Sequence, residues 1–227
     1  MRQIPLALAL ASEPDFDSFV AGANRVALDS LRALAPLMAP AAPVYLHGPP
    51  GSGKTHLLAA LTHRLQGQGG RAGWFDAAQS LPWNFDEHWS LIVIDGAERL
   101  DPPRQHAAFG LFVDAATHGV LIAGAGRLPP VDLPLREDLR SRFGWGLVFG
   151  LQPLSESDSR AALAREALRR GLSLPDEVLN FLLTRYPREL GSLMAMLDRL
   201  DRYALAEGRS LTVPLLKEMV AEDGPQR

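Results

Sequence analysis

The stretch GPPGSGKT at residues 48–55 restricts the fold of this 227-residue chain more than any other part of the sequence. It fits the pattern GxxxxGK[ST] in full, after the apolar run VYLHG and before a predicted helix from Lys54 to about Gln66. The glycines let backbone N–H groups turn toward an anion, and the positive end of the helix dipole adds to the attraction. The pattern therefore predicts a phosphate-binding P-loop. A Gly/Pro turn with an exposed lysine is the alternative.

A nucleotide is the expected ligand of this loop. Lys54 is expected to reach the β- and γ-phosphates, and Thr55 to place its hydroxyl on Mg²⁺. Asp95 ends the apolar run LIVID and is expected to hold the water shell of the same ion, with a helix cap as the alternative. His56 is a further candidate contact, for which local packing is the alternative. The predicted loop contacts are Pro50, Gly51, Ser52, Gly53, Lys54, Thr55 and His56.

The residue after Asp95 bears on hydrolysis. Many P-loop ATPases carry an acid at this position, where it orients the attacking water. Here it is Gly96, and Glu98 could replace the acid only if the turn bends it back. We therefore predict nucleotide binding with weak or absent ATP hydrolysis by this chain alone.

Strand-like and helical segments alternate in the first two thirds of the chain. The apolar runs VYLHG, RAGWF, LIVID, VLIAGA and GLVFGL predict five strands, and the helices between them predict a parallel sheet of α/β type. After Ser155, which resembles a helix cap together with Asp158, only helical patterns follow. The predicted organisation is a tail over 1–15, an α/β nucleotide-binding domain over 16–153 and an all-helical domain over 154–227.

Composition excludes several classes of protein. Hydrophobic residues make up 47% of the chain, but no run of about 18 apolar residues could span a membrane. The absence of cysteine excludes disulfides and thiol catalysis. The six histidines are scattered, which disfavours a dedicated metal cage, and a net charge of −3 disfavours a strong nucleic-acid binder.

Three further segments resemble signatures of the bacterial initiator DnaA. They are FVAGANRVA at 19–27, EDLRSRFGWGL at 137–147 and YPREL at 186–190. With the P-loop they lie in the expected order, and the resemblance covers about residues 16–222. It implies an AAA+ P-loop NTPase with a five-stranded parallel sheet as its base, a small helical lid, and the nucleotide between them.

The resemblance also implies roles for individual residues. Arg142 would be an arginine finger that acts in trans, and Arg188 would approach the γ-phosphate from the lid; a solvated surface arginine is the alternative for each. Trp145 is expected in the core. The polar residue expected at the end of the fourth strand is not evident, because Ala125 and Gly126 stand there. The segment expected across the adenine contributes Phe19, Val20, Gly22 and Asn24.

DnaA continues into a helix-turn-helix domain, for which we expect no room after Arg227, so direct sequence-specific DNA binding is not expected. The remaining pattern resembles Hda, a family of DnaA-related regulatory inactivators whose N-terminal QLxLPL motif docks on the sliding clamp (the beta subunit of DNA polymerase III). In an extended tail, alternate aliphatic residues would fill one apolar groove. A signal peptide, an edge strand and a disordered tail are alternatives. The residues that match the clamp motif are Gln3, Ile4, Pro5, Leu6, Ala7 and Leu8.

This resemblance implies a cytoplasmic regulator that holds ADP or ATP with Mg²⁺. It would dock on the clamp and use Arg142 to stimulate ATP hydrolysis by DnaA, which prevents re-initiation. The resident nucleotide, the surface that meets DnaA and the oligomeric state, including a homo-oligomer, stay open. The alternatives are a self-sufficient ATPase such as a helicase loader, a small-molecule kinase and a DNA-binding regulator.

Overall fold

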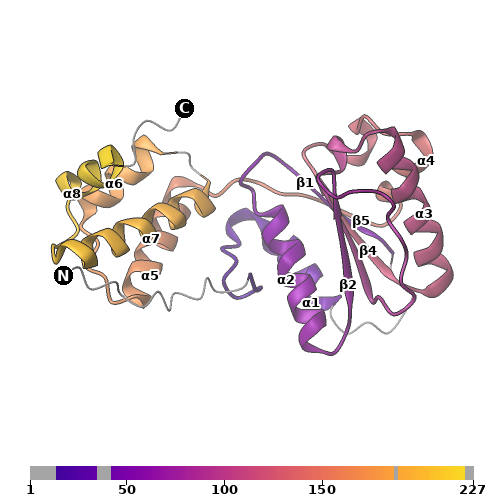
Figure 1. The fold of residues 1–227 in the computed structure, drawn as a ribbon, viewed down its shortest axis with the longest axis horizontal. Helices are drawn as coiled ribbons and strands as arrows, with labels where there is room; N and C mark the ends of the chain where they lie inside the picture. The colour runs from indigo at the N-terminus through magenta and orange to yellow at the C-terminus, as the bar shows by residue number, and fades with distance from the viewer. Residues whose placement is uncertain (1–13, 35–41, 187–188, 223–227) are drawn as a thin grey trace. The chain divides into compact units, whose positions relative to one another are not determined.

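The computed structural model describes residues 14–34, 42–186 and 189–222. They form two compact units, the first ending at Pro153 and the second beginning at Leu154. The first unit contains a sheet of five parallel strands in the order β2-β3-β4-β1-β5 (Figure 1), as predicted. These strands are β1 (Val44–His47), β2 (Ala72–Asp76), β3 (Leu91–Asp95), β4 (Leu121–Gly126) and β5 (Leu147–Gly150).

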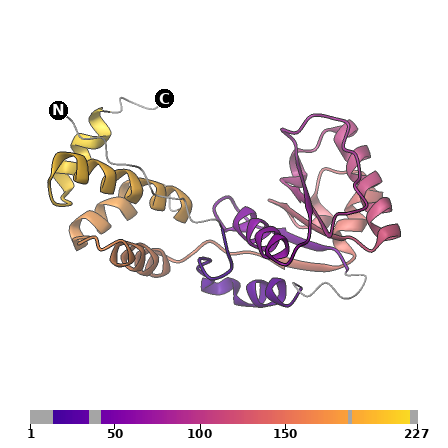
Figure 2. The same ribbon diagram turned by 60° about the horizontal axis from the view of Figure 1, so that its bottom comes forward.

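Helices cover both faces of the sheet (Figures 1 and 2). They are α1 (Arg25–Ala33) and α2 (Lys54–Gly67) on one face, and α3 (Pro102–His118) and α4 (Glu137–Gly144) on the other. Strand side chains alternate between the two apolar cores. In β3, Leu91 and Val93 join the core of α1 and α2, whereas Ile92 and Ile94 join that of α3 and α4. This double coverage explains the unbroken apolar run LIVID.

The register of the sheet brings three strand ends to one edge. β4 lies between β1 and β3, with Gly126 opposite His47 and Ala125 opposite Asp95. Ligands of open parallel sheets bind outside the carboxyl ends of the strands. The loop at 48–55 follows β1 at this edge, so the loop and Asp95 are separated in the sheet by β4 alone.

The second unit is helical throughout the part of the chain that the structure describes. It contains α5 (Glu156–Arg169), α6 (Asp176–Arg185), α7 (Leu190–Glu207) and α8 (Val213–Glu222), which enclose a core rich in leucine. α5 begins with the predicted cap, because the Ser155 hydroxyl accepts a hydrogen bond from the Asp158 N–H at 3.1 Å. None of the helices in the described ranges is both long and apolar enough to cross a membrane.

A cluster of charges ties α5 to α7. Glu166 accepts hydrogen bonds from Arg169 Nε at 2.8 Å and from Arg170 Nε at 2.7 Å, and Arg170 also donates to Asp198 of α7 at 3.0 Å. The hydrogen bond from Arg169, opposed by partial burial and reinforced by Arg170, lowers the pKa of Glu166 to about 2. The carboxylate therefore stabilises the folded unit when it is ionised.

Glu166→Gln is expected to lower Tm at pH 7 by about 2–4 °C. Because the folded pKa lies below the unfolded value of 4.5, the contribution is complete above that value and is lost as the pH falls toward 2. Circular dichroism melts from pH 7 to pH 3 should show the gap to wild type shrinking in the acid range. The control Glu177→Gln removes an exposed carboxylate on α6 and should leave Tm nearly unchanged. A Glu166→Gln gap that is constant with pH would contradict this account.

Candidate phosphate-binding site

The loop between β1 and α2 has the backbone form of an anion cradle. Gly53 caps α2 in the left-handed region, with φ 93°, which a glycine adopts without strain. Ser52 is 4% exposed and its N–H donates to the Pro49 carbonyl at 3.3 Å, which closes the loop. The N-terminal turn of α2 points its free N–H groups toward the same space. The local geometry is therefore that of a phosphate site.

Two charged side chains surround the cradle. Lys54 Nζ donates to the carbonyls of Gly48 and Pro49, each at 2.8 Å, so the ammonium is held over the loop. Thr55 Oγ1 donates to Asp95 Oδ2 at 2.7 Å, which joins α2 to the end of β3. Hydroxyl and carboxylate oxygens are the donors that Mg²⁺ prefers, and this ion commonly completes its shell with water and phosphate. The two residues fit the predicted magnesium role.

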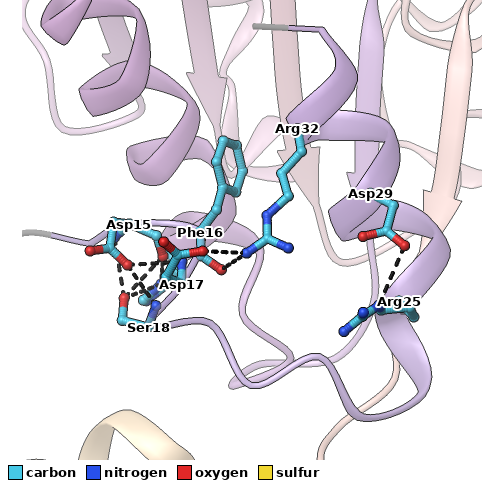
Figure 3. A network of polar contacts seen from close by, with 8 residues as sticks. Asp15, Phe16, Asp17, Ser18, Arg25, Asp29 and Arg32 are labelled. Carbon is cyan, nitrogen blue, oxygen red and sulfur yellow. Dashed lines mark hydrogen bonds and ion pairs between the residues drawn. The ribbon is translucent and has the colours of Figure 1, made fainter.

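The chain reaches this site through a tight turn that begins at Asp15 (Figure 3). Asp15 Oδ1 accepts a hydrogen bond from the Ser18 N–H at 2.6 Å, and this bond lowers the pKa of Asp15. Arg32 of α1 donates to the Phe16 carbonyl at 2.9 Å. His56 Nε2 lies 3.0 Å from the carbonyl oxygen of Asp15. The turn is therefore tied to both α1 and α2.

Phe19 lies directly against the loop. A Cβ atom at Gly53 would come within 2.5 Å of the Phe19 ring, and the rings of Phe19 and His56 are 5.6 Å apart. His56 thus packs against the segment that was predicted to lie across the adenine. Val20 follows Phe19, and Gly22 opens the short helix η1 (Gly22–Asn24) that leads into α1.

Asn24 is buried, with 5% of its surface exposed, and both the nitrogen and the oxygen of its amide are hydrogen-bonded. Its Nδ2 donates to the Gln152 carbonyl, and its Oδ1 accepts from the Gln152 N–H, both at 2.8 Å. This pair joins the segment before α1 to the end of the first unit. The role seen for Asn24 is thus to position backbone, and a contact with nucleotide stays a prediction.

Glycine stands at two positions at the carboxyl ends of the strands, Gly96 after β3 and Gly126 at the end of β4, where a longer side chain could have faced a bound phosphate. Gly96 has φ 70°, and a Cβ atom there would collide with the guanidinium of Arg99. Gly126 ends β4, and a Cβ atom there would collide with the Tyr45 hydroxyl and lie 2.9 Å from Glu98 Oε2. Arg99 of η2 (Ala97–Arg99) therefore fills the space at Gly96, and Tyr45 of β1 together with Glu98 of η2 fills the space at Gly126.

Tyr45 of β1 stabilises the turn that follows Gly126. Its hydroxyl donates to the Leu128 carbonyl at 3.2 Å, which holds the turn after β4. Burial, followed by the negative charges of Glu98 and Asp95, raises the pKa of Tyr45. The phenol therefore stays protonated and keeps its hydrogen bond at neutral pH.

Arg142 lies near the end of α4 on a partly exposed surface. Its Cζ is 5.5 Å from the centroid of the Phe109 ring of α3, a cation–π contact, and no ion pair holds it among the residues that the structure describes. Phe143, between Arg142 and the helix end, is fully buried against Tyr45. The guanidinium is thus held in place without a neutralising carboxylate.

Our prediction that Trp145 belongs to the core is wrong. Its side chain is 77% exposed. Phe143 takes the core position, and Trp145, three residues after Arg142 in helical geometry, lies on the same side of α4 as Arg142. An exposed tryptophan therefore stands beside the predicted finger.

Several predicted residues cannot be placed. Arg188 and the clamp-motif residues 3–8 lie outside the described residues. Conversely, the sequence analysis did not predict that the guanidinium of Arg99 fills the space beside Gly96.

Comparisons with known proteins agree with this architecture. Residues 156–220 match the family model of the Hda lid domain, and residues 10–71 match the model of the bacterial DnaA ATPase domain. Domain III of the replication initiation protein DnaA from Thermotoga maritima superposes with a TM-score of 0.75 at 21% identity, over 92% of this chain and 95% of that chain.

Two other solved structures have the same fold. AMPPCP-bound DnaA from Aquifex aeolicus has a TM-score of 0.71 at 20% identity, over 92% of this chain and 70% of that chain. A RuvB variant from Thermotoga maritima has a TM-score of 0.69 at 16% identity, over 92% and 72% respectively. The sheet, the loop at 48–55 and the helical second unit together have the α/β AAA+ fold. Within that fold, the two family matches support a DnaA-related protein whose residues 156–220 are similar to the Hda lid domain.

Proposed function

We propose that this chain is a nucleotide-bound regulator of replication initiation that stimulates ATP hydrolysis by DnaA. One observation carries the proposal: a complete phosphate cradle adjoins two positions, Gly96 and Gly126, whose side-chain space is filled by groups of the chain itself. Such a site suits binding better than turnover. The Hda lid match supports regulation of DnaA, and the regulator would act in the cytoplasm.

An adenine nucleotide is the proposed ligand. AMPPCP-bound DnaA from Aquifex aeolicus, which has this fold, supports the choice. Lys54 would exchange its carbonyl partners for phosphate oxygens, and Thr55 and Asp95 would hold Mg²⁺ with its water shell. A bound Mg²⁺ neutralises phosphate charge. ADP is a sufficient ligand in this proposal, because Gly96 and Gly126 carry no side chain that could contact a γ-phosphate.

Hydrolysis by the chain itself is proposed to be weak or absent. The acid that would orient the attacking water is replaced by Gly96, and the guanidinium of Arg99 fills the space beside it. A cation at this place cannot accept a proton from water. Steady ATP turnover by the isolated chain, abolished by Asp95→Asn, would instead favour the alternative of a self-sufficient ATPase.

Arg142 is proposed to act on the nucleotide of DnaA. In that reaction water attacks the γ-phosphorus, the bond to the β–γ bridging oxygen breaks, and ADP and phosphate leave. Negative charge develops on the phosphoryl oxygens, where a guanidinium stabilises it. The cation–π contact with Phe109 would orient Arg142 before DnaA binds. The exposed ring of Trp145 would become buried in the interface with DnaA, as tryptophans at binding hot spots do.

The segment that begins with Gln3 is proposed to bind the sliding clamp. Gln3→Ala should weaken capture of the chain by immobilised clamp at least tenfold, or about 1.4 kcal/mol, because the glutamine would lose its polar contacts. The measurement is a titrated pull-down with purified clamp. Gln68→Ala, at an exposed position after α2, is the matched control and should bind like wild type. Equal clamp binding by Gln3→Ala and Gln68→Ala would contradict the proposal that the segment beginning with Gln3 binds the clamp.

A further inference from the structure

A buried glutamine of α3 takes part in neither the phosphate site nor the mechanism described so far. Gln105 is 8% exposed, and both polar atoms of its amide are hydrogen-bonded. Its Oε1 accepts from the Arg136 N–H at 3.0 Å, and its Nε2 donates to the Leu100 carbonyl at 2.8 Å. A buried amide favours one arrangement of the segments that it joins, because any other arrangement leaves its polar atoms unpaired.

The two partners of Gln105 belong to segments far apart in the chain. Leu100 ends η2, the short helix that follows β3. Arg136 is the N-cap residue of α4, the helix that carries Arg142. In a capping box, a polar side chain at the third helical position bonds the N–H of the N-cap residue. Here the buried Leu139 stands at that position, and Gln105 of α3 supplies the acceptor instead.

α3 also contacts the other end of α4, and the two helices lie side by side (Figure 1). Phe109 follows Gln105 by four residues, a spacing that places both on one side of α3. The Cζ atoms of Arg142 and Arg136 lie 5.5 Å and 5.8 Å from the centroid of the Phe109 ring. α3 thus contacts α4 at two points, through an amide at its first residue and a ring at its last turn. Two points fix the direction of a helix of 8 residues.

We infer that Gln105 is a positioning residue for the arginine finger. The inference rests on the proposed function and deepens it, because the hydrogen bond to the Arg136 N–H sets where α4 begins and therefore where Arg142 points. Gln105 acts through α4 and not on the phosphoryl group itself. Stabilisation of a reacting group depends steeply on geometry, and a misplacement of about 1 Å can cost about 100-fold in rate.

The test is phosphate release from ATP-bound DnaA, measured with clamp loaded on DNA at increasing concentrations of this chain. Gln105→Met keeps the length of the side chain and removes both hydrogen bonds. It should lower the maximal rate about tenfold or more and change the half-saturating concentration less than about twofold. Gln105→Glu offers an oxygen to the Arg136 N–H in either ionisation state, so its maximal rate should stay within about threefold of wild type.

A merely structural role for Gln105 would give a different result. A less stable chain has fewer folded molecules, which raises the half-saturating concentration and leaves the rate at saturation unchanged. Such a result for Gln105→Met would overturn the inference. If circular dichroism shows that Gln105→Met does not fold, Gln105→Glu decides the question. Retention of its maximal rate would support the inference, and a folded Gln105→Glu variant with a maximal rate lowered about tenfold would overturn it.

His106→Met is the matched control, because His106 is the next residue of α3 and is exposed. Its maximal rate should equal that of wild type. A loss in His106→Met as large as in Gln105→Met would indicate a general effect on α3 and would overturn the inference. Failure of wild type to stimulate DnaA would instead refute the proposed function, so the two failures can be told apart.

Discussion

Arg142→Ala is expected to remove the stimulation of DnaA, with the rate of ATP hydrolysis in the complex falling about 10³-fold or more. The guanidinium is the proposed source of positive charge at the transferred phosphoryl group, and Phe109 holds it in place beforehand. The measurement is phosphate release from ATP-bound DnaA in the presence of this chain and clamp loaded on DNA. Nucleotide and clamp binding by the variant should match wild type, because Arg142 lies on α4, whereas the loop at 48–55 joins β1 to α2.

Arg140→Ala is the matched control for this experiment. Arg140 lies on the same helix and donates weakly, at 3.4 Å, to the Val131 carbonyl. It should retain nearly full stimulation. An Arg142→Ala variant that still stimulated DnaA like wild type would refute the arginine-finger mechanism, whereas loss in both variants would indicate a general effect on α4.

Lys54→Ala is expected to weaken binding of both ADP and ATP about 100-fold. The ammonium is held over the cradle by the carbonyls of Gly48 and Pro49, and phosphate oxygens would replace those partners. Fluorescence competition against a labelled nucleotide measures the change. A circular dichroism spectrum should show that the fold is retained, because the Lys54 side chain lies at the loop and not in an apolar core.

The control for Lys54 is Lys217→Ala. Lys217 lies on α8 and its Nζ is 5.6 Å from the centroid of the Phe181 ring, so it shares the charge of Lys54 but belongs to the helical unit. Its removal should change the nucleotide Kd less than about twofold, within the range of ordinary surface substitutions. Nucleotide affinity that is equal in Lys54→Ala and wild type would exclude the P-loop as the binding site.

Local patterns predicted much of the fold. The run LIVID became a central strand, because both of its faces are covered by helices and every side chain can be apolar. The cap at Ser155 and the helix after Gly53 also follow from residues close together in the chain. Such features depend on hydrogen bonds and backbone angles within a few residues, which a sequence displays directly.

Contacts between distant segments explain what was missed. Trp145 and Phe143 are both aromatic and only two residues apart, and composition does not tell which of them reaches the core. Position on α4 decides it, because only the side of the helix that faces Tyr45 and Phe112 is buried. Likewise, the sequence shows Glu98 only as an acid two residues after Gly96, the position where many P-loop ATPases carry one. Its approach to Gly126 depends on the pairing of β3 with β4.

The sequence by itself determined the class of protein, because the P-loop glycines, Lys54 and Thr55 are contiguous and a strand and a helix must flank them. It also predicted a role for Asp95 at the phosphate site, whereas the hydrogen bond between Asp95 and Thr55 depends on how the sheet is assembled. The tertiary structure alone decided how the two glycine positions are filled. Arg99, Glu98 and Tyr45 come from other parts of the backbone, and the register of parallel strands sets which of them share an edge.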